Sequence, residues 1–203
     1  MKFADIHAKV GHLQFTIERN ARMLYDRIID EGVEHVLELG IAYGKATCYI
    51  AAALDELGRG RIDAVDLVSA KDFFDPCAED LLKSVGLDAY VNIYRMQSGY
   101  TWFLHDAIKR ATHEGVCEPQ YDLAIIDGPK NWTIDGAAFF MTDKLLRQGG
   151  TLIFDDYAWT YAEAASRGSA TTDGISHRSM SSEEMNLPQI HEVFELLVRQ
   201  HPS

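Results

Sequence analysis

Long apolar runs, basic residues and cysteines are all scarce in this sequence, and each scarcity argues against a class of protein. No apolar stretch approaches the roughly 18–20 residues that a helix needs to span a bilayer, and no signal peptide is evident. The 19 Lys and Arg residues are outnumbered by 31 Asp and Glu residues, which gives a formal net charge of −12 and leaves no basic stripe. We therefore expect neither nucleic acid nor a membrane as a partner.

Cysteine occurs only at Cys48, Cys77 and Cys117, an odd number without metal-ligand spacing. Cys48 falls within a helical pattern and is most simply a small core residue. Cysteine this sparse fits a reducing compartment, so we expect a cytoplasmic protein.

The common nucleotide-binding motifs are also absent. Gly40 and Gly44 bracket an expected turn between a buried strand and a helix. Ala42 and Lys45, however, occupy positions where the dinucleotide fingerprint Gly-x-Gly-x-x-Gly requires glycine, and no P-loop occurs. A glycine-rich turn that opens a helix still lets a ligand approach free backbone N–H groups. The turn therefore predicts a ligand site of another type.

Strand-like and helix-like segments alternate through most of the 203 residues, whose 47% apolar content is ordinary for one globular domain. Such alternation predicts a doubly wound α/β sheet, with the ligand crevice beside the first strand, where the strand order reverses. The expected strands cover 36–40, 61–68, 89–96, 121–127 and 151–155. The expected helices cover 3–31, 45–57, 71–85, 102–111, 137–146 and 188–199, whereas 158–185 has no sustained period.

Carboxylates follow two consecutive expected strands: Asp127 the fourth, and Asp155 and Asp156 the fifth. A helix over 137–146, ended by Gly149–Gly150, connects these strands in parallel, so their carboxyl ends share one edge of the sheet. Three acids at one edge would repel each other, and Mg²⁺, which prefers oxygen ligands, is the simplest cation to hold them together. The alternative for each aspartate alone is a turn residue or a helix N-cap.

Polar side chains at the first three strands are candidates for binding a nucleoside. Glu38 lies inside an apolar strand, which is costly unless its carboxylate has a partner. Asp66 ends the second strand, where a carboxylate can accept hydrogen bonds from the hydroxyls of a ribose, although a solvated aspartate is an equal alternative. Gln97 and Ser98 follow the third strand, where they could contact an adenine edge.

Taken together, these motifs resemble those of the class I S-adenosylmethionine-dependent methyltransferases. The resemblance rests on Glu38-Leu-Gly40-x-x-x-Gly44, the acidic residue that ends the second strand, and the carboxylates that follow the fourth and fifth strands, and it covers 34–157. More narrowly, the pattern is similar to that of the cation-dependent O-methyltransferases, which include catechol O-methyltransferase and the macrolide and aminocoumarin sugar O-methyltransferases. The resemblance implies a Rossmann-like, mainly parallel sheet with strand order 3-2-1-4-5 and helices on both faces.

The resemblance also divides one expected domain, 1–203, into three parts. These are an N-terminal helical cap over 1–33, a cofactor and metal core over 34–157, and a substrate loop with the last helix over 158–203. Family members continue with two more strands, an antiparallel pair beside the fifth. We expect this C-terminal strand pair to be missing here, either because the chain is trimmed or because it is a natural short form whose edge strand is covered by a loop or a partner. Because an open edge strand invites pairing with another chain, we expect a homo-oligomer.

The resemblance further implies two sets of ligand-binding residues. In the first set, Gly40, Tyr43 and Gly44 would wrap the methionine half of S-adenosylmethionine, with Glu38 ordering the same loop and Asp66 on the ribose. The full cofactor set is Glu38, Gly40, Tyr43, Gly44, Asp66, Gln97, Ser98 and Asp127. The second set holds Mg²⁺ or another divalent cation and comprises Asp127, Asp155 and Asp156.

Lys130 is the candidate catalytic base, because Asp127-Gly-Pro-Lys130 keeps the Asp-x-x-Lys spacing of the catechol enzyme. The sugar enzymes instead carry a histidine near this place, where the present chain has Asn131-Trp132. The departure leaves the base and the substrate class open. An equal alternative for Lys130 is an ion pair with the aspartates.

The expected function is therefore metal-dependent transfer of a methyl group to a hydroxyl of a small molecule, either a phenol or catechol or the sugar of a natural product. Trp132, Tyr157 and Trp159 could wall the acceptor, although aromatic residues at such places are more often packing residues. Two alternatives stay open: a methyltransferase that needs no metal, and a non-catalytic protein that binds S-adenosylmethionine or a partner protein.

Overall fold

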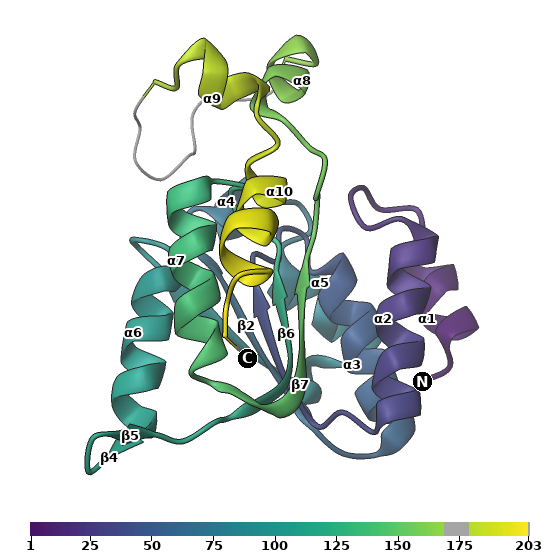
Figure 1. The fold of residues 1–203 in the computed structure, drawn as a ribbon. Coiled ribbons are helices and arrows are strands. Elements are labelled where there is room, and N and C mark those ends of the chain that lie inside the picture. Colours follow the sequence, from purple (N-terminus) through teal and green to yellow (C-terminus); the bar gives the residue numbers. More distant parts are fainter. Residues whose placement is uncertain (169–178, 203) are drawn as a thin grey trace.

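A parallel five-stranded sheet forms the centre of the protein in a computed structural model that describes residues 1–168 and 179–202 (Figure 1). The spatial order is β3-β2-β1-β6-β7 and every neighbouring pair is parallel, which confirms the predicted doubly wound sheet. The strands are β1 (His35–Leu39), β2 (Arg61–Leu67), β3 (Val91–Met96), β6 (Tyr121–Ile126) and β7 (Leu146–Phe154).

The strand register brings the carboxyl ends of the central strands level with one another. Leu39 of β1 is the partner of Val65 on one side and of Ile126 on the other. Ile126 is in turn the partner of Phe154 of β7. The residues that follow these four positions therefore lie along one edge, at the point where the strand order reverses.

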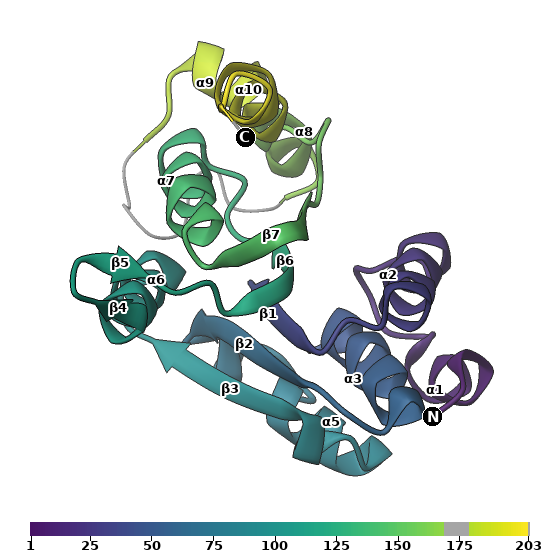
Figure 2. The same cartoon turned by 60° about the horizontal axis from the view of Figure 1, so that its bottom comes forward.

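Helices cover both faces of the sheet and enclose two separate apolar cores (Figure 2). On one face, the apolar stripe of α3 contributes Tyr49, Ile50 and Leu54, all fully buried. On the other face, Phe103 and Leu104 of α6 pack toward the sheet. The first layer consists of α1 (Phe3–Val10), α2 (Glu18–Glu31), α3 (Lys45–Leu57) and α5 (Ala78–Val85), and the second is built on α6 (Tyr100–Ala111) and α7 (Trp132–Asp143), with α10 (Gln189–Val193) packed against α7.

The remaining elements are short. They are α4 (Ala70–Phe73), the 3₁₀ turn η1 (Asp88–Tyr90), the hairpin of β4 (Thr112–His113) and β5 (Val116–Cys117), α8 (Tyr161–Ser166), α9 (Ser182–Asn186) and the π-helical turn η2 (Phe194–Val198). No helix in the described ranges is both long enough and apolar enough to cross a bilayer.

The expected single helix over 3–31 is wrong, because the chain leaves the helix between α1 and α2. Gly11 follows the last residue of α1, and Phe15 adopts a positive φ of 72°, which is incompatible with a continuous helix. The buried ammonium of Lys45 holds the break by donating hydrogen bonds to the carbonyls of Gly11 (3.1 Å) and Leu13 (2.5 Å).

The expected helix over 71–85 is also interrupted. It divides into α4 and α5 around Pro76, which has no N–H to donate and clashes with the preceding helical turn. The third strand begins at Val91 rather than at Ala89, because 88–90 form the turn η1.

The helix expected over 137–146 begins earlier, at Trp132, where Asn131 caps it. Gly149 and Gly150, expected to end that helix, lie instead in the first half of β7. The pairing of β7 with β6 shifts register there, and regular pairing resumes at Thr151, where the sequence predicted the strand to begin.

The C-terminal part contains more helix than expected. In 158–185, which shows no sustained period, α8 forms and α9 begins, while 169–178 lie outside the described residues. The last helix is confirmed as α10 continuing into η2, but Pro188 occupies the N-cap position rather than the first helical position.

Candidate cofactor and metal site

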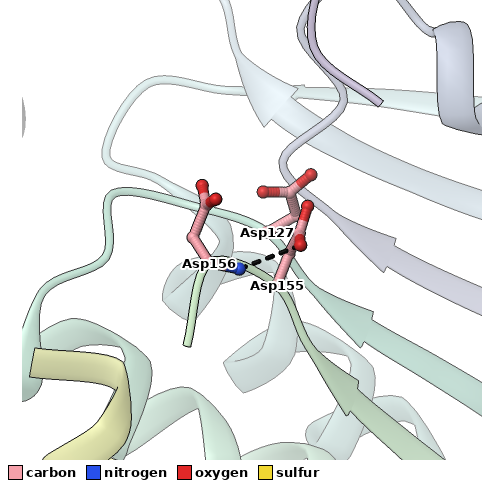
Figure 3. Close-up of side chains that lie close together, drawn as sticks. All are labelled: Asp127, Asp155 and Asp156. Carbon is pink, nitrogen blue, oxygen red and sulfur yellow. Dashed lines mark hydrogen bonds between the residues drawn. The ribbon is translucent and has the colours of Figure 1, made fainter. Parts of the chain in front are cut away.

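Three aspartates meet at the carboxyl ends of β6 and β7 (Figure 3). Asp127, Asp155 and Asp156 each offer one carboxylate oxygen, and these three oxygens lie within 4.8 Å of one another. The backbone N–H of Asp156, which adopts a positive φ of 57°, donates a 2.9 Å hydrogen bond to Oδ1 of Asp155. Neighbouring strands therefore bring together the acids that the sequence predicted to converge.

Lys130 lies beside this acidic cluster and is 9% exposed. Its Nζ donates hydrogen bonds to Oδ1 of Asp127 and to the carbonyl of Gly128 (2.9 Å), and it lies 3.4 Å from Oδ2 of Asp156. One ammonium among three carboxylates leaves two negative charges in excess when all four groups are ionised. A divalent cation would neutralise that excess.

Burial and the charge of the partner residue both shift the pKa values of Asp127 and Lys130. Burial raises the pKa of Asp127 to about 6; Lys130 opposes this rise, and Asp155 and Asp156 add to it. Burial alone would lower the pKa of Lys130, but the charges of Asp127, Asp156 and Asp155 outweigh burial, and its pKa is raised. Lys130 therefore carries its proton in this arrangement.

A small cavity lies between the acidic cluster and the N-terminal helical layer. Asp127 and Asp155 line it on the sheet side, and Thr16 and Asn20 line it from the start of α2. Its volume of about 30 Å³ is enough for a water molecule.

Gly40 places the glycine-rich turn directly against the end of β6, where Asp127 lies. It adopts a φ of 93°, and a Cβ at this position would overlap the carbonyl oxygen of Asp127 and lie 2.7 Å from its carbonyl carbon. Gly44, with a φ of 81°, precedes α3 and lies so close to Ala78 that a Cβ would be 2.8 Å from the methyl group of that residue. Only glycine permits both the backbone conformation and the close approach.

Asp66 holds the same turn from the end of β2. Its Oδ2 accepts hydrogen bonds from the backbone N–H groups of Ile41 (3.0 Å) and Ala42 (2.9 Å), and its Oδ1 accepts one from Leu67 (2.7 Å). A carboxylate has about four acceptor positions, so roughly one is left for a ligand hydroxyl. Ribose binding by Asp66 stays a prediction, and the structure adds that Asp66 shapes the turn.

Glu38 lies under the turn and is 1% exposed. Its carboxyl group accepts a 2.7 Å hydrogen bond from Oγ1 of Thr47 in the first turns of α3. Burial raises the pKa of Glu38 from 4.5 to about 8, the Thr47 hydrogen bond lowers it, and the charges of Asp127 and Asp66 raise it further.

The raised pKa of Glu38 predicts a stability that falls with increasing pH. Above pH 4.5 the unfolded chain releases this proton while the folded chain retains it up to about pH 8. Glu38 should therefore contribute a decrease in the free energy of unfolding of about 1.4 kcal/mol per pH unit across that window. Glu38→Gln should remove most of this slope, measured by urea unfolding at pH 5 to 8.

The matched control for this measurement is Glu118→Gln, at an exposed glutamate between α6 and β6. It should retain the slope of the parent protein. Parallel profiles for the parent and Glu38→Gln would show that Glu38 does not take up the proton on folding.

The other predicted cofactor residues lie at the same edge. Tyr43 packs in an aromatic cluster, with ring centroids 5.7 Å from Phe15 and 4.7 Å from Phe74. Gln97 and Ser98 are exposed immediately after β3. Because Met96 is the register partner of Leu67, Gln97 and Ser98 lie beside the end of β2.

Two of the three aromatic candidates for an acceptor wall, Tyr157 and Trp159, make ring contacts within the protein. Tyr157 packs edge-on against Phe194 at 5.8 Å and its hydroxyl donates a 3.2 Å hydrogen bond to Glu195. Trp159 packs edge-on against Tyr161 at 4.7 Å. Trp132 begins α7, where its backbone N–H donates a 2.7 Å hydrogen bond to the buried side chain of Gln189.

The sequence did not predict that four further residues lie near the site. Thr16 and Asn20 reach the cavity because the N-terminal helix breaks, which the apolar period did not reveal. Tyr100 and Asp135 are buried and hydrogen-bonded to each other beneath the loop that carries Lys130. An aspartate in the first turn of a helix is ordinary, so only the tertiary contact distinguishes Asp135.

The family model of a methyltransferase domain matches residues 37–157, which is more than half of the chain. A search of curated proteins found no match.

Solved structures with the same arrangement include three methyltransferases. A methyltransferase of Podospora anserina bound to S-adenosylhomocysteine has a TM-score of 0.65 at 13% identity, over 98% of this chain and 78% of that chain. An O-methyltransferase of Streptomyces achromogenes involved in tomaymycin synthesis, in complex with S-adenosylmethionine, has a TM-score of 0.61 at 17% identity, over 98% and 76%. An O-methyltransferase of Bacillus cereus in complex with S-adenosylhomocysteine has a TM-score of 0.60 at 18% identity, over 98% and 76%. At these identities the likeness shows the shared fold.

Proposed function

The chain belongs to the methyltransferase-domain family, and we propose that it transfers the methyl group of S-adenosylmethionine to a hydroxyl group of a small molecule with the help of a divalent cation. The observation that carries this proposal is the convergence of Asp127, Asp155 and Asp156 beside the glycine-rich turn. A phenol, a catechol or the sugar of a natural product is the class of acceptor.

The acidic cluster fits a hard divalent cation. Its donors are all carboxylate oxygens, the ligands that Mg²⁺ prefers, and its excess of two negative charges matches the charge of the ion. Two oxygens bound to one Mg²⁺ lie at most about 4.2 Å apart, and the three carboxylate oxygens, which lie within 4.8 Å of one another, would need only small side-chain rotations to reach that spacing. When bound there, the cation would lower the pKa of an acceptor hydroxyl and orient it.

The residues of the turn support binding of the cofactor at the neighbouring position. Gly40 and Gly44 leave the two ends of the turn without side chains, and Asp66 fixes the shape of the turn through Ile41 and Ala42. The O-methyltransferases of the same fold that were solved with S-adenosylmethionine or S-adenosylhomocysteine support the choice of ligand. The reaction breaks the bond from the methyl carbon to the sulfonium sulfur and forms one to the acceptor oxygen, which loses its proton.

Lys130 neutralises and holds the carboxylates in this structure, as the ion-pair alternative predicts. It donates to Asp127 and to the carbonyl of Gly128, and its raised pKa keeps it protonated. Before Lys130 could accept a proton from the acceptor it would have to release its own. Its role as catalytic base therefore stays a prediction.

Removal of the metal tests the proposal. The full chain is incubated with methyl-labelled S-adenosylmethionine and a set of phenols, catechols and sugars, with Mg²⁺ or with a chelator. Because the hydroxyl is a poor nucleophile without the ion, we expect the chelator to lower turnover at least about tenfold and added Mg²⁺ to restore it. Incorporated label is the measurement.

A second candidate, methyl transfer without a metal, is favoured by one observation. Lys130 already contacts Asp127 and lies 3.4 Å from Asp156, so an internal cation partly offsets the repulsion within the cluster. Turnover that is equal with chelator and with Mg²⁺ would support this candidate. Cofactor binding without methylation of any acceptor would instead support a non-catalytic binding protein.

A further inference from the structure

The loop from Gly128 to Asn131 joins the metal-binding end of β6 to α7 and lies directly on Tyr100. Tyr100 is the first residue of α6 and is 4% exposed. A Cβ at Gly128 would lie 2.7 Å from the Cζ atom of the Tyr100 ring, so the ring and the loop backbone are in close contact. Within the same loop Lys130 adopts a positive φ of 61°, which is uncommon for a residue with a side chain.

Asp135 fixes the other end of this loop from the first turn of α7. Its side chain is fully buried, and its two oxygens have different partners. Oδ1 accepts a hydrogen bond from the hydroxyl of Tyr100, and Oδ2 accepts a 2.6 Å hydrogen bond from the backbone N–H of Asn131. Asn131 in turn caps α7 by accepting hydrogen bonds from the N–H groups of Thr133 (2.9 Å) and Ile134 (3.1 Å).

We propose that Tyr100 and Asp135 act as positioning residues for the metal site: together they hold the 128–131 loop so that Asp127 and Lys130 face Asp155 and Asp156. The inference rests on the proposed function, because it concerns the cation of that same site. Neither side chain belongs to the acidic cluster, so both act through the loop backbone. Coordination requires ligand positions held to about half an ångström, which a loop with a strained residue achieves only with support from its surroundings.

A purely local role for Asp135 accounts for only part of this geometry. An acidic residue in the first turn of a helix interacts favourably with the helix N-terminus, and a bond to Asn131 serves that purpose. The bond from Tyr100 adds nothing to helix capping. Tyr100 belongs to another helix, α6, and its ring contacts Gly128, one residue after the proposed metal ligand Asp127.

Tyr100→Phe tests the inference by removing only the hydroxyl while keeping the ring under Gly128. The matched control is Tyr121→Phe, because Tyr121 is also a buried tyrosine whose hydroxyl donates to an aspartate, Asp63, at 2.8 Å. Tyr121 lies at the opposite end of β6 from Asp127. The measurement is the dissociation constant for Mn²⁺, by titration calorimetry of the full chain without acceptor, together with the urea midpoint of each variant.

We expect Tyr100→Phe to weaken Mn²⁺ binding roughly tenfold, as is usual for loss of a group that orients a metal ligand, and Tyr121→Phe to leave it unchanged. Amide hydrogen exchange gives a second measurement that needs no metal. The N–H of Asn131 should exchange faster in Tyr100→Phe than in the parent protein, because the carboxylate that it binds is no longer fixed by Tyr100.

Three outcomes would overturn the inference. Equal Mn²⁺ affinity in the parent and Tyr100→Phe would overturn it alone and leave the proposed function intact. Equal weakening in Tyr100→Phe and Tyr121→Phe would show a general loss of packing instead. A parent protein that binds no Mn²⁺ would overturn the proposed metal site and this inference with it. If Tyr100→Phe does not fold, Asp135→Asn, which keeps one acceptor, is measured in the same way.

Discussion

Asp155→Ala is expected to abolish metal-stimulated methyl transfer while cofactor binding survives. Asp155 follows β7 and supplies one of the three converging oxygens, whereas the glycine-rich turn and Asp66 belong to β1 and β2. Loss of one of three protein ligands should lower kcat/KM for the acceptor at least about 100-fold, equivalent to roughly 2.7 kcal/mol of transition-state stabilisation. Turnover is measured with saturating Mg²⁺, and binding of S-adenosylhomocysteine by calorimetry.

The control for this variant is Asp26→Ala, at an exposed carboxylate on α2. It removes the same group without touching the cluster, so both turnover and cofactor binding should stay at the level of the parent protein. If Asp155→Ala lost cofactor binding and turnover to the same extent, Asp155 would have a structural role in the site and would not be a metal ligand.

The acidic cluster could be predicted from the sequence because few structural variables determine it. Parallel strands joined by a helix end on one edge, so residues directly after two neighbouring strands must lie close together. Asp127 and Asp155 follow Ile126 and Phe154, which are register partners in the sheet. The register of β6 and β7 therefore brings Asp127 and Asp155 close together, and errors in the predicted boundaries of the intervening helix did not affect this prediction.

The contacts of the loop that follows β6 could not be predicted in this way. The ion pair of Lys130 with Asp127 depends on a positive φ at Lys130, which nothing in Gly-Pro-Lys-Asn requires. The support from Tyr100 and Asp135 joins residues 35 positions apart on two helices. Both features arise from tertiary packing, and a helical or strand period carries no information about them.

The break in the N-terminal helix was missed for a related reason. The apolar residues of α1 and α2 each follow a helical period, so the sequence suggested one element. The break depends on Lys45, whose buried ammonium binds the carbonyls of Gly11 and Leu13 in place of the next helical turn. Lys45 directly follows Gly44, so the glycine-rich turn is also tied to the segment that leads to Thr16, which lines the cavity.

Backbone contact between the turn and the end of β6 couples the proposed cofactor site to the proposed metal site. Gly40 accounts for this coupling, since a Cβ at this position would overlap the carbonyl oxygen of Asp127 and lie 3.1 Å from the Cα of Gly128. The N–H of Asp127 meanwhile donates a 2.8 Å hydrogen bond to the carbonyl of Leu39. A displacement of the turn must therefore displace Asp127, and binding at the two proposed sites should be lost together.

Gly40→Ala should show this joint failure. The new methyl group would overlap the carbonyl oxygen of Asp127 at a backbone φ of 93° that L-residues rarely adopt. Backbone strain of about 1–2 kcal/mol and overpacking of about 1–3 kcal/mol together predict a loss of roughly 2–5 kcal/mol in the free energy of unfolding. In protein that remains folded, binding of S-adenosylhomocysteine and of Mn²⁺ should both weaken, measured by calorimetry beside urea unfolding.

Gly58→Ala separates backbone strain from steric overlap. Gly58 also has a positive φ, of 68°, and ends α3, but a Cβ there would meet nothing within 4 Å. It should therefore cost only the strain of about 1–2 kcal/mol and leave both ligands bound as tightly as before. If Gly40→Ala cost no more than Gly58→Ala and kept its affinity for Mn²⁺, the turn and the end of β6 would be free to move independently, and the coupling between the two sites would be refuted.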